Sequence, residues 1–182
     1  MKVQNYIEKL ELVEGVTVTV DKNTITLKGE KGEVSRRFIE PSIIISVEDN
    51  SIKFDIKKYT KSEKTLLGTY KSHLKNIMKG VIEGHEYRLK ICSGHFPMNV
   101  SFNNNIFQVK NFLGEKIPRK LEISKEVQLV VEGDSVTING INKELVAQTA
   151  ASIEQLTRRS NFDKRVFQDG IYIVIKDGKE IK

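Results

Sequence analysis

The feature that most constrains the fold of this chain is an internal repeat. The stretch VTVDKNTITLKGEKGE at residues 18–33 aligns without a gap on VSFNNNIFQVKNFLGE at residues 100–115, at an offset of 82. Further along, TLLGTYKSHLKNI at 65–77 aligns on ELVAQTAASIEQL at 144–156, at an offset of 79. Few residues are identical, but the apolar positions coincide. Two copies, rather than the three or more of a solenoid, predict two tandem copies of one small domain.

Within each copy, the spacing of apolar residues changes from that of strands to that of a helix. Alternating runs, the pattern of half-buried strands, lie at residues 16–20, 25–27, 43–47 and 52–56, and again at 87–91, 100–102, 107–109, 127–131 and 136–138. The segments 66–81 and 145–156 then carry apolar residues three and four apart, as on one face of a helix. Thr60 and Glu63 have the spacing of a capping box before the first helix.

This order of elements predicts the α+β class, as two tandem copies of a small domain, each an antiparallel sheet packed against one helix. We expect a first α+β repeat at residues 1–82, a second at 83–175 and a basic C-terminal tail at 176–182. No apolar run approaches the roughly 20 residues that span a bilayer, and the N-terminus lacks the apolar core of a signal peptide. We therefore expect a cytoplasmic protein that has no membrane partner.

The sequence offers one pair of residues with catalytic chemistry, Cys92 and His95. A cysteine beside a histidine can form an activated nucleophile, but Cys92 continues the alternating run of residues 87–91, and the interpretation as a packed cysteine is favoured. Because Cys92 is the only cysteine, an internal disulfide and a zinc site of several thiolates are excluded. The histidines have no metal-binding spacing, and no phosphate-binding glycine loop is present. We expect no enzyme activity, cofactor or metal.

The distribution of arginines says more than the net charge of +6. Residues 1–80 carry 15 basic and 11 acidic residues, and residues 81–182 carry 15 and 13, so the second half is the less basic by total. It nevertheless holds five of the seven arginines. The planar guanidinium binds phosphate in bidentate fashion, whereas lysine acts as a point charge. The second copy is therefore the better candidate for binding a polyanion.

Basic residues gather in two places in the second copy. The loop NFLGEKIPRK at residues 111–120 carries Lys116, Arg119 and Lys120 around the flexible Gly114. The second helix ends at Arg158-Arg159, where cations complement the helix dipole, so simple capping is the alternative interpretation. Lys164-Arg165 follow, with aromatic residues on either side, a combination that suits phosphates and exposed bases of RNA. In the first copy, Arg36-Arg37 suits a solvated strand as well as a binding role.

Three stretches resemble a known family. NFLGEKIPRK and DKRVFQDGIYI, at residues 163–173, are similar to signature stretches of the archaeal and eukaryotic branch of universal large-subunit ribosomal protein six, and GTYKSHLKNIMKGVIEG, at 68–84, resembles its first helix and interdomain joint. The duplicated α+β domain is also that family's architecture. The short length and the lack of long basic extensions favour an archaeal member.

The resemblance implies a structural constituent of the large ribosomal subunit that binds large-subunit rRNA mainly through its second domain. It implies a position near the stalk base, beside neighbouring large-subunit proteins and close to the region where translational GTPases dock. The expected RNA-binding residues are Gly114, Lys116, Arg119, Lys120, Arg158, Arg159, Lys164, Arg165, Gln168 and Gly170. A free-standing RNA-binding or RNA-chaperone module of the same fold, and an enzyme using Cys92 and His95, remain as alternatives.

Overall fold

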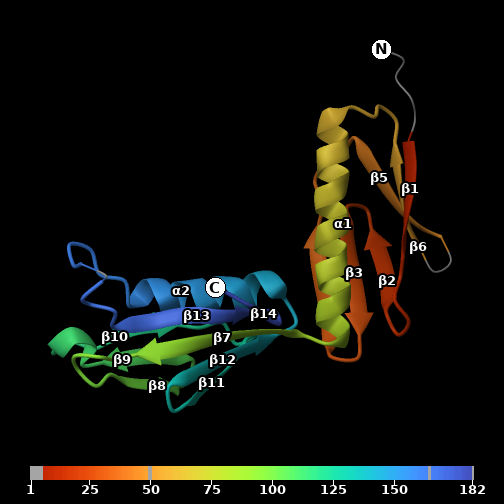
Figure 1. The fold of residues 1–182 in the computed structure, drawn as a ribbon. Helices are drawn as coiled ribbons and strands as arrows, with labels where there is room; N and C mark the ends of the chain where they lie inside the picture. The colour runs from red at the N-terminus through yellow and green to blue at the C-terminus, as the bar shows by residue number, and fades with distance from the viewer. Residues whose placement is uncertain (1–5, 49–50, 164, 182) are drawn as a thin grey trace. The chain divides into compact units, whose positions relative to one another are not determined.

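A computed structural model describes residues 6–48, 51–163 and 165–181 of the chain. The chain divides into two compact units, Met1–Gly84 and His85–Lys182, so that the division lies between the first long helix and the strand that follows it (Figure 1). Each unit contains antiparallel strands and one α-helix. The expected fold class, two tandem sheet-and-helix domains of the α+β type, is therefore confirmed.

The first unit has two sheets of three strands each, in the orders β1-β6-β5 and β2-β3-β4. Its elements are β1 (Tyr6–Glu11), β2 (Thr17–Asp21), β3 (Thr24–Gly29), β4 (Gly32–Arg37), β5 (Ile43–Glu48), β6 (Ser51–Ile56) and α1 (Lys61–Ile82). The strand residues that alternate in the sequence alternate in burial. In β6, for instance, Ile52, Phe54 and Ile56 are fully buried, while the residues between them are partly exposed.

The helix α1 begins where the capping box predicts. Thr60 is the N-cap residue, and its backbone N–H donates to the carboxylate of Glu63 at 3.1 Å. The buried face of the helix carries Leu67, Leu74 and Met78, which are seven and four residues apart, about two turns and one turn of a helix. The helix is thus held by an amphipathic face and a satisfied first turn.

The second unit also has two sheets, of five strands in the order β11-β12-β7-β13-β14 and of three in the order β10-β9-β8. Its elements are β7 (His85–Cys92), β8 (Asn99–Asn103), β9 (Ile106–Lys110), the short 3-10 helix η1 (Phe112–Gly114), β10 (Arg119–Glu122), β11 (Gln128–Glu132), β12 (Ser135–Gly140), α2 (Lys143–Leu156), β13 (Gly170–Lys176) and β14 (Lys179–Glu180). The segment expected as a basic tail thus carries the short strand β14, which pairs with β13.

The helix α2 packs across β7, β12 and β13 of the larger sheet and also meets β10 of the smaller one. Val146, Ala150 and Ile153 form its buried face, four and three residues apart. They join one hydrophobic core with side chains of both sheets and of η1, among them the fully buried Phe107 and Phe112. Because η1 contributes to this core, the loop that contains it is attached to the body of the unit.

The two units share one plan of strands, to which the second unit adds β13 and β14 among the described residues. Strands β8 and β9 follow β2 and β3 at the offset of 82, β12 follows β6 at 84, and β7 follows β1 at 79 when the strands are matched by their pairing. The structure adds that the strands of each unit divide between two sheets. It also adds strands that the alternating runs did not include, namely β1, β4, β10, β13 and β14. Of these, β10 includes Arg119 and Lys120, which were expected in a loop.

Candidate RNA interface

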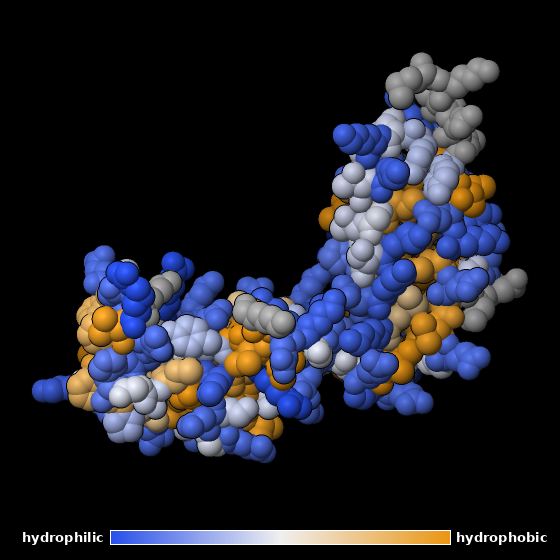
Figure 2. All heavy atoms as spheres, viewed as in Figure 1, coloured by the Kyte–Doolittle hydropathy of each residue, from blue (hydrophilic) through white to orange (hydrophobic). Residues whose placement is uncertain are grey.

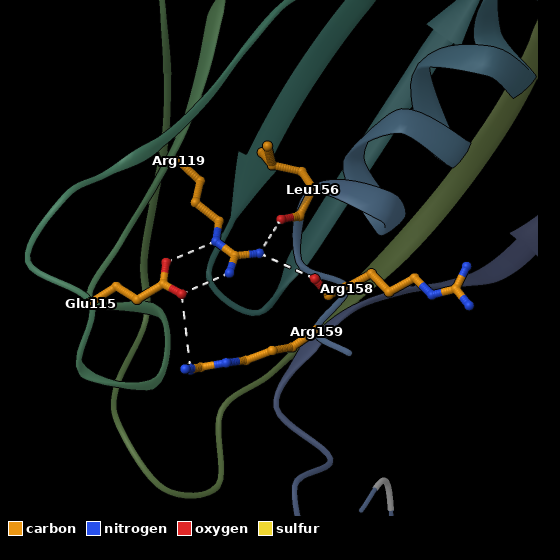
Figure 3. Close-up of polar contacts among 5 residues, drawn as sticks. All are labelled: Glu115, Arg119, Leu156, Arg158 and Arg159. Atoms are coloured by element: carbon orange, nitrogen blue, oxygen red, sulfur yellow. Dashed lines mark hydrogen bonds and ion pairs between the residues drawn. The ribbon is translucent and has the colours of Figure 1, made fainter. Parts of the chain in front are cut away.

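The expected RNA-binding residues of the second unit that the structure describes lie on the loop 111–118, which joins β9 to β10, on β10 itself, on the segment 157–169 and at the start of β13. The segment 157–169 leads from the end of α2 at Leu156 into β13. A single side chain, Arg119 at the start of β10, joins the loop to the end of the helix (Figure 3).

Arg119 uses its whole guanidinium group within the protein. Nε and Nη2 donate to the two carboxylate oxygens of Glu115 at 2.8 and 2.7 Å, and Nη1 donates to the backbone carbonyls of Leu156 at 2.6 Å and Arg158 at 3.3 Å. The group also lies over the ring of Phe112, 4.4 Å from its centroid. It thereby satisfies carbonyls at the C-terminus of α2 that have no partner within the helix. Arg119 was expected to contact RNA. In the structure it instead holds the loop 111–118 against the end of α2.

The backbone of the loop 111–118 turns sharply at three closely spaced residues. Asn111, Leu113 and Gly114 have φ angles of 59°, 47° and 78°, in the left-handed region. Between them, Phe112 is inserted into the core with 1% of its surface exposed. The glycine suits its position because it adopts this backbone without strain, whereas at Leu113 the same conformation costs energy that the buried neighbour offsets.

The two adjacent arginines at the helix end have different surroundings. Arg159 lies 3.9 Å from Glu115, with its guanidinium 4.2 Å from the centroid of the Phe162 ring. The Arg158 side chain points away from this cluster, toward solvent (Figure 3). The hydrogen bonds from Arg119 lower the pKa of Glu115 below its ordinary value, and the charge of Arg159 acts in the same direction. Glu115 therefore stays ionised and holds both arginines.

Most of the other expected residues are exposed. The exposed residues among them are Lys116, Lys120, Arg158, Arg159, Arg165 and Gln168. Arg165 forms an ion pair with Asp163, with Nη2 and Oδ2 3.0 Å apart, but 90% of its side chain remains accessible, so its charge faces solvent. Gly114 is exposed as well, whereas Lys164 lies outside the described residues. These positions leave a set of cations available at one end of the unit.

Gly170 is buried, unlike Gly114. A methyl group at this glycine would lie 3.1 Å from ring atoms of Tyr172, which is closer than ordinary van der Waals contact. Because Gly170 has no side chain, the ring of Tyr172 in the same strand can lie close to its backbone.

The sequence interpretation missed a contact that anchors the segment 157–169. Asp169 is almost fully buried and accepts hydrogen bonds from the backbone N–H groups of Gly94 at 2.6 Å and His95 at 3.0 Å, and from His95 Nδ1 at 2.5 Å. Burial opposes the ionisation of Asp169, but these hydrogen bonds outweigh it and lower its pKa. No spacing in the sequence points to this contact, because the partners lie 74 residues apart.

His95 is therefore engaged with Asp169, and its ring also stacks on Phe167 with the centroids 5.0 Å apart. Cys92 is the last residue of β7, paired in register with Gly170. Within the described residues, no group of three histidine, cysteine, aspartate or glutamate side chains could hold a metal ion. Nor is any described helix both long and apolar enough to cross a membrane.

Hydrophobic residues lie among the cations at this end of the unit. Figure 2 shows hydrophobic and hydrophilic residues side by side where the loop 111–118 lies. Ile117, in that loop, is 82% exposed, and Val166 and Phe96 are 58% and 48% exposed. Charge combined with accessible apolar and aromatic groups is typical of surfaces that bind RNA.

Fold and surface together define a class of protein: a duplicated α+β chain whose second copy presents fixed cations. The comparisons with known proteins identify the family. The family described as ribosomal protein L6 matches residues 13–84 and 96–170, one segment in each unit, and the chain belongs to it. The resemblance noted in the sequence is therefore confirmed, as is the expectation that the chain is not an enzyme, because this is a family of ribosomal proteins.

Three archaeal relatives are similar to nearly the whole chain, and each carries the name large ribosomal subunit protein uL6. The relative from Methanobrevibacter smithii is 44% identical over 93% of this chain and 96% of its own length. The relative from Methanosarcina mazei is 46% identical over 92% and 95%, and that from Methanocella arvoryzae 45% identical over 93% and 97%.

Proposed function

We propose that this chain binds large-subunit rRNA mainly through its second unit, as a structural constituent of the large ribosomal subunit. It is a ribosomal protein of the large subunit by family, and such a protein works in the cytoplasm, within the ribosome. The observation that carries the proposal is the Arg119 contact, which joins the loop that carries Lys116 to the helix end that precedes Arg158 and Arg159. Through it, cations from segments far apart in the sequence lie at one end of a single rigid unit.

The proposed mechanism is positional. Arg158, Lys116 and Lys120 are exposed on a framework whose backbone is fixed by the core and by Glu115. Such a framework recognises the placement of phosphates on a folded RNA rather than the identity of its bases. Binding then depends strongly on salt concentration, because each neutralised phosphate releases counterions.

The proposal extends to location. The family resemblance implies a place near the stalk base, beside other large-subunit proteins and close to the docking region of translational GTPases. Chemical footprinting of the rRNA in large subunits that lack and then regain this protein tests this. Protection confined to nucleotides at the stalk base and the GTPase-docking region is expected, and protection only elsewhere would refute the location while leaving rRNA binding intact.

Co-sedimentation with large subunits after a high-salt wash tests the function itself. A constituent of the subunit stays bound through the wash. A free-standing RNA-binding or RNA-chaperone module would be released and would bind unrelated RNAs with similar affinity. The double variant Arg158→Ala/Arg159→Ala should be retained less than the wild-type chain, and Arg36→Ala/Arg37→Ala in the first unit is its matched control.

A further inference from the structure

A cavity of about 390 Å³ lies beside the end of α2. Its volume falls in the range of roughly 300–1,000 Å³ that is typical of small-molecule sites. Three aromatic rings line it, those of Phe162, Phe167 and Tyr172, together with the side chains of Gln155, Arg158 and Arg159. Leu113 of η1 closes it from the loop 111–118. Both segments that Arg119 joins therefore contribute to the cavity.

The rings in this cavity are held in place but are not fully covered. Phe162 and Phe167 meet edge to face, with centroids 5.0 Å apart and an angle of 85° between their planes. Phe167 in turn stacks on His95, which Asp169 fixes. Tyr172 lies against the backbone of Gly170 and remains 42% exposed, and Phe162 is 37% exposed. A planar ligand would find positioned aromatic surface here without rearranging the core.

The charges around the cavity suit an anionic polymer. Of the two lining carboxylates, Asp169 is hydrogen-bonded to Gly94 and His95, and Glu154 accepts from the backbone N–H of Ile173 at 3.3 Å. The Arg158 and Gln155 side chains are exposed at the rim. Arginine supplies donors for phosphate, and the glutamine amide offers both a donor and an acceptor to the edge of a base. A hydrophobic peptide would use the rings but would leave the rim arginine without an anionic partner.

We propose that this cavity holds one unstacked nucleobase of the rRNA, which stacks on the ring of Tyr172 while Arg158 binds an adjacent phosphate. This inference rests on the proposed function, because the nucleobase belongs to the rRNA that the second unit is proposed to bind. Single-stranded bases splayed onto aromatic side chains are a general mode of RNA recognition. The second unit would then combine phosphate contacts with one base contact.

Ultraviolet cross-linking provides the direct test. The full chain is bound to protein-free large-subunit rRNA and irradiated, the RNA and protein are digested, and nucleotide adducts are located by mass spectrometry. An adduct on Phe162, Phe167 or Tyr172 is the expected result. Adducts confined to other parts of the second unit would overturn the base site and leave rRNA binding in place. Adducts only in the first unit would overturn both proposals.

Binding measurements over a series of salt concentrations separate the two proposals further. Tyr172→Ala should weaken rRNA binding roughly tenfold, the scale of one lost stacking contact, without changing the salt slope, because no phosphate contact is lost. Tyr172→Phe keeps the ring and should bind like the wild-type chain. Tyr6→Ala serves as the matched control, since Tyr6 is similarly exposed at 37% but lies in the first unit.

The outcomes of these measurements are distinct. Wild-type affinity for Tyr172→Ala, with thermal unfolding showing an intact second unit, would overturn the base site alone. A changed salt slope for this variant would also count against it, because it would assign Tyr172 to phosphate positioning. A wild-type chain that fails to bind the rRNA would overturn the proposed function as well.

Discussion

The hairpins β3–β4 and β9–β10 are equivalent in the two units, yet they differ in their connections. The first pair is joined by the two residues 30–31, whereas the second pair is joined by the eight residues 111–118. The longer connection inserts Phe112 into the core and positions Glu115 for Arg119. The two hairpins thus share their strands, and the difference between them is the longer loop, which carries Glu115 and Lys116.

The connections that follow the two helices also differ, and again the longer one is in the second unit. Helix α1 has 22 residues and is followed directly by β7, whereas α2 has 14 and is followed by the segment 157–169 and then by β13. Within the described part of the chain, the first unit has no strand equivalent to β13. Additions at one end therefore distinguish the second unit, which is proposed to bind rRNA, from the first, and the following predictions test that distinction.

The largest effect is expected from Phe112→Ala in the long loop. Removing a fully buried phenylalanine should lower the unfolding free energy of the second unit by about 3–5 kcal/mol. Thermal unfolding monitored by residue-specific NMR signals of each unit measures this. Ile117→Ala in the same loop is the control, since its side chain is 82% exposed and the change should stay within about 0.5 kcal/mol. Equal losses for both variants would show that the loop is not anchored through the core.

A smaller loss of stability, about 2 kcal/mol, is expected from Arg119→Ala. The substitution leaves Glu115 and the carbonyl of Leu156 without their donor. Arg119→Lys should recover only part of the loss, because lysine cannot form the bidentate contact. Arg88→Ala is the control: its ion pair with Glu86 is largely exposed, and such pairs contribute about 0–1 kcal/mol. Urea unfolding at neutral pH provides the comparison, and an Arg119→Ala chain as stable as Arg88→Ala would contradict the positioning role.

Binding should distinguish the two copies. Arg158→Ala/Arg159→Ala should weaken rRNA binding and lower the salt slope by roughly one per lost phosphate contact. Arg36→Ala/Arg37→Ala in β4 should change both quantities much less. Filter binding over a salt series measures affinity and slope together. A larger effect in β4 would assign the main RNA surface to the first unit.

The smallest effect concerns acid stability. The pKa of Glu115 is lowered in the folded unit, first through its hydrogen bond with Arg119. Its contribution to stability is therefore complete above its ordinary pKa of 4.5 and is lost as the pH falls through the lower folded value. Glu115→Gln should make the second unit less sensitive to acid in this window. Glu126→Gln, an exposed substitution in the same unit, should leave the pH profile of unfolding unchanged.

Much of the framework could be predicted from the sequence because apolar periodicity reflects burial directly. The alternation at residues 52–56 and the capping box at Thr60 both correspond to the observed elements. Strand β1 was missed because charged residues interrupt its pattern: Glu8 faces Lys71 of α1 and forms an ion pair with it instead of entering the core. Strand β10 is short and follows a loop rich in turn residues, which concealed it.

The site could be predicted only as a set of cations. The sequence does not distinguish the exposed Arg158 from the enclosed Arg119, because the difference in their exposure depends on Glu115 and on where α2 ends. The contact of Asp169 with His95 joins residues far apart in the chain, and no pattern of nearby residues indicates it. The distribution of arginines thus points to the second unit as the proposed RNA-binding unit, whereas the folded geometry determines which of its side chains are exposed.

The Arg119 contact also has a kinetic consequence. Because the loop and the helix end are already joined in the protein alone, their conformational entropy is lost during folding rather than during association. We expect encounter with the rRNA to be fast and governed by long-range attraction between opposite charges. The lifetime of the complex would then depend on the short-range contacts with the rRNA. Substitutions of Arg119 should therefore lower the association rate constant, whereas substitutions of exposed aromatic residues should raise the dissociation rate constant.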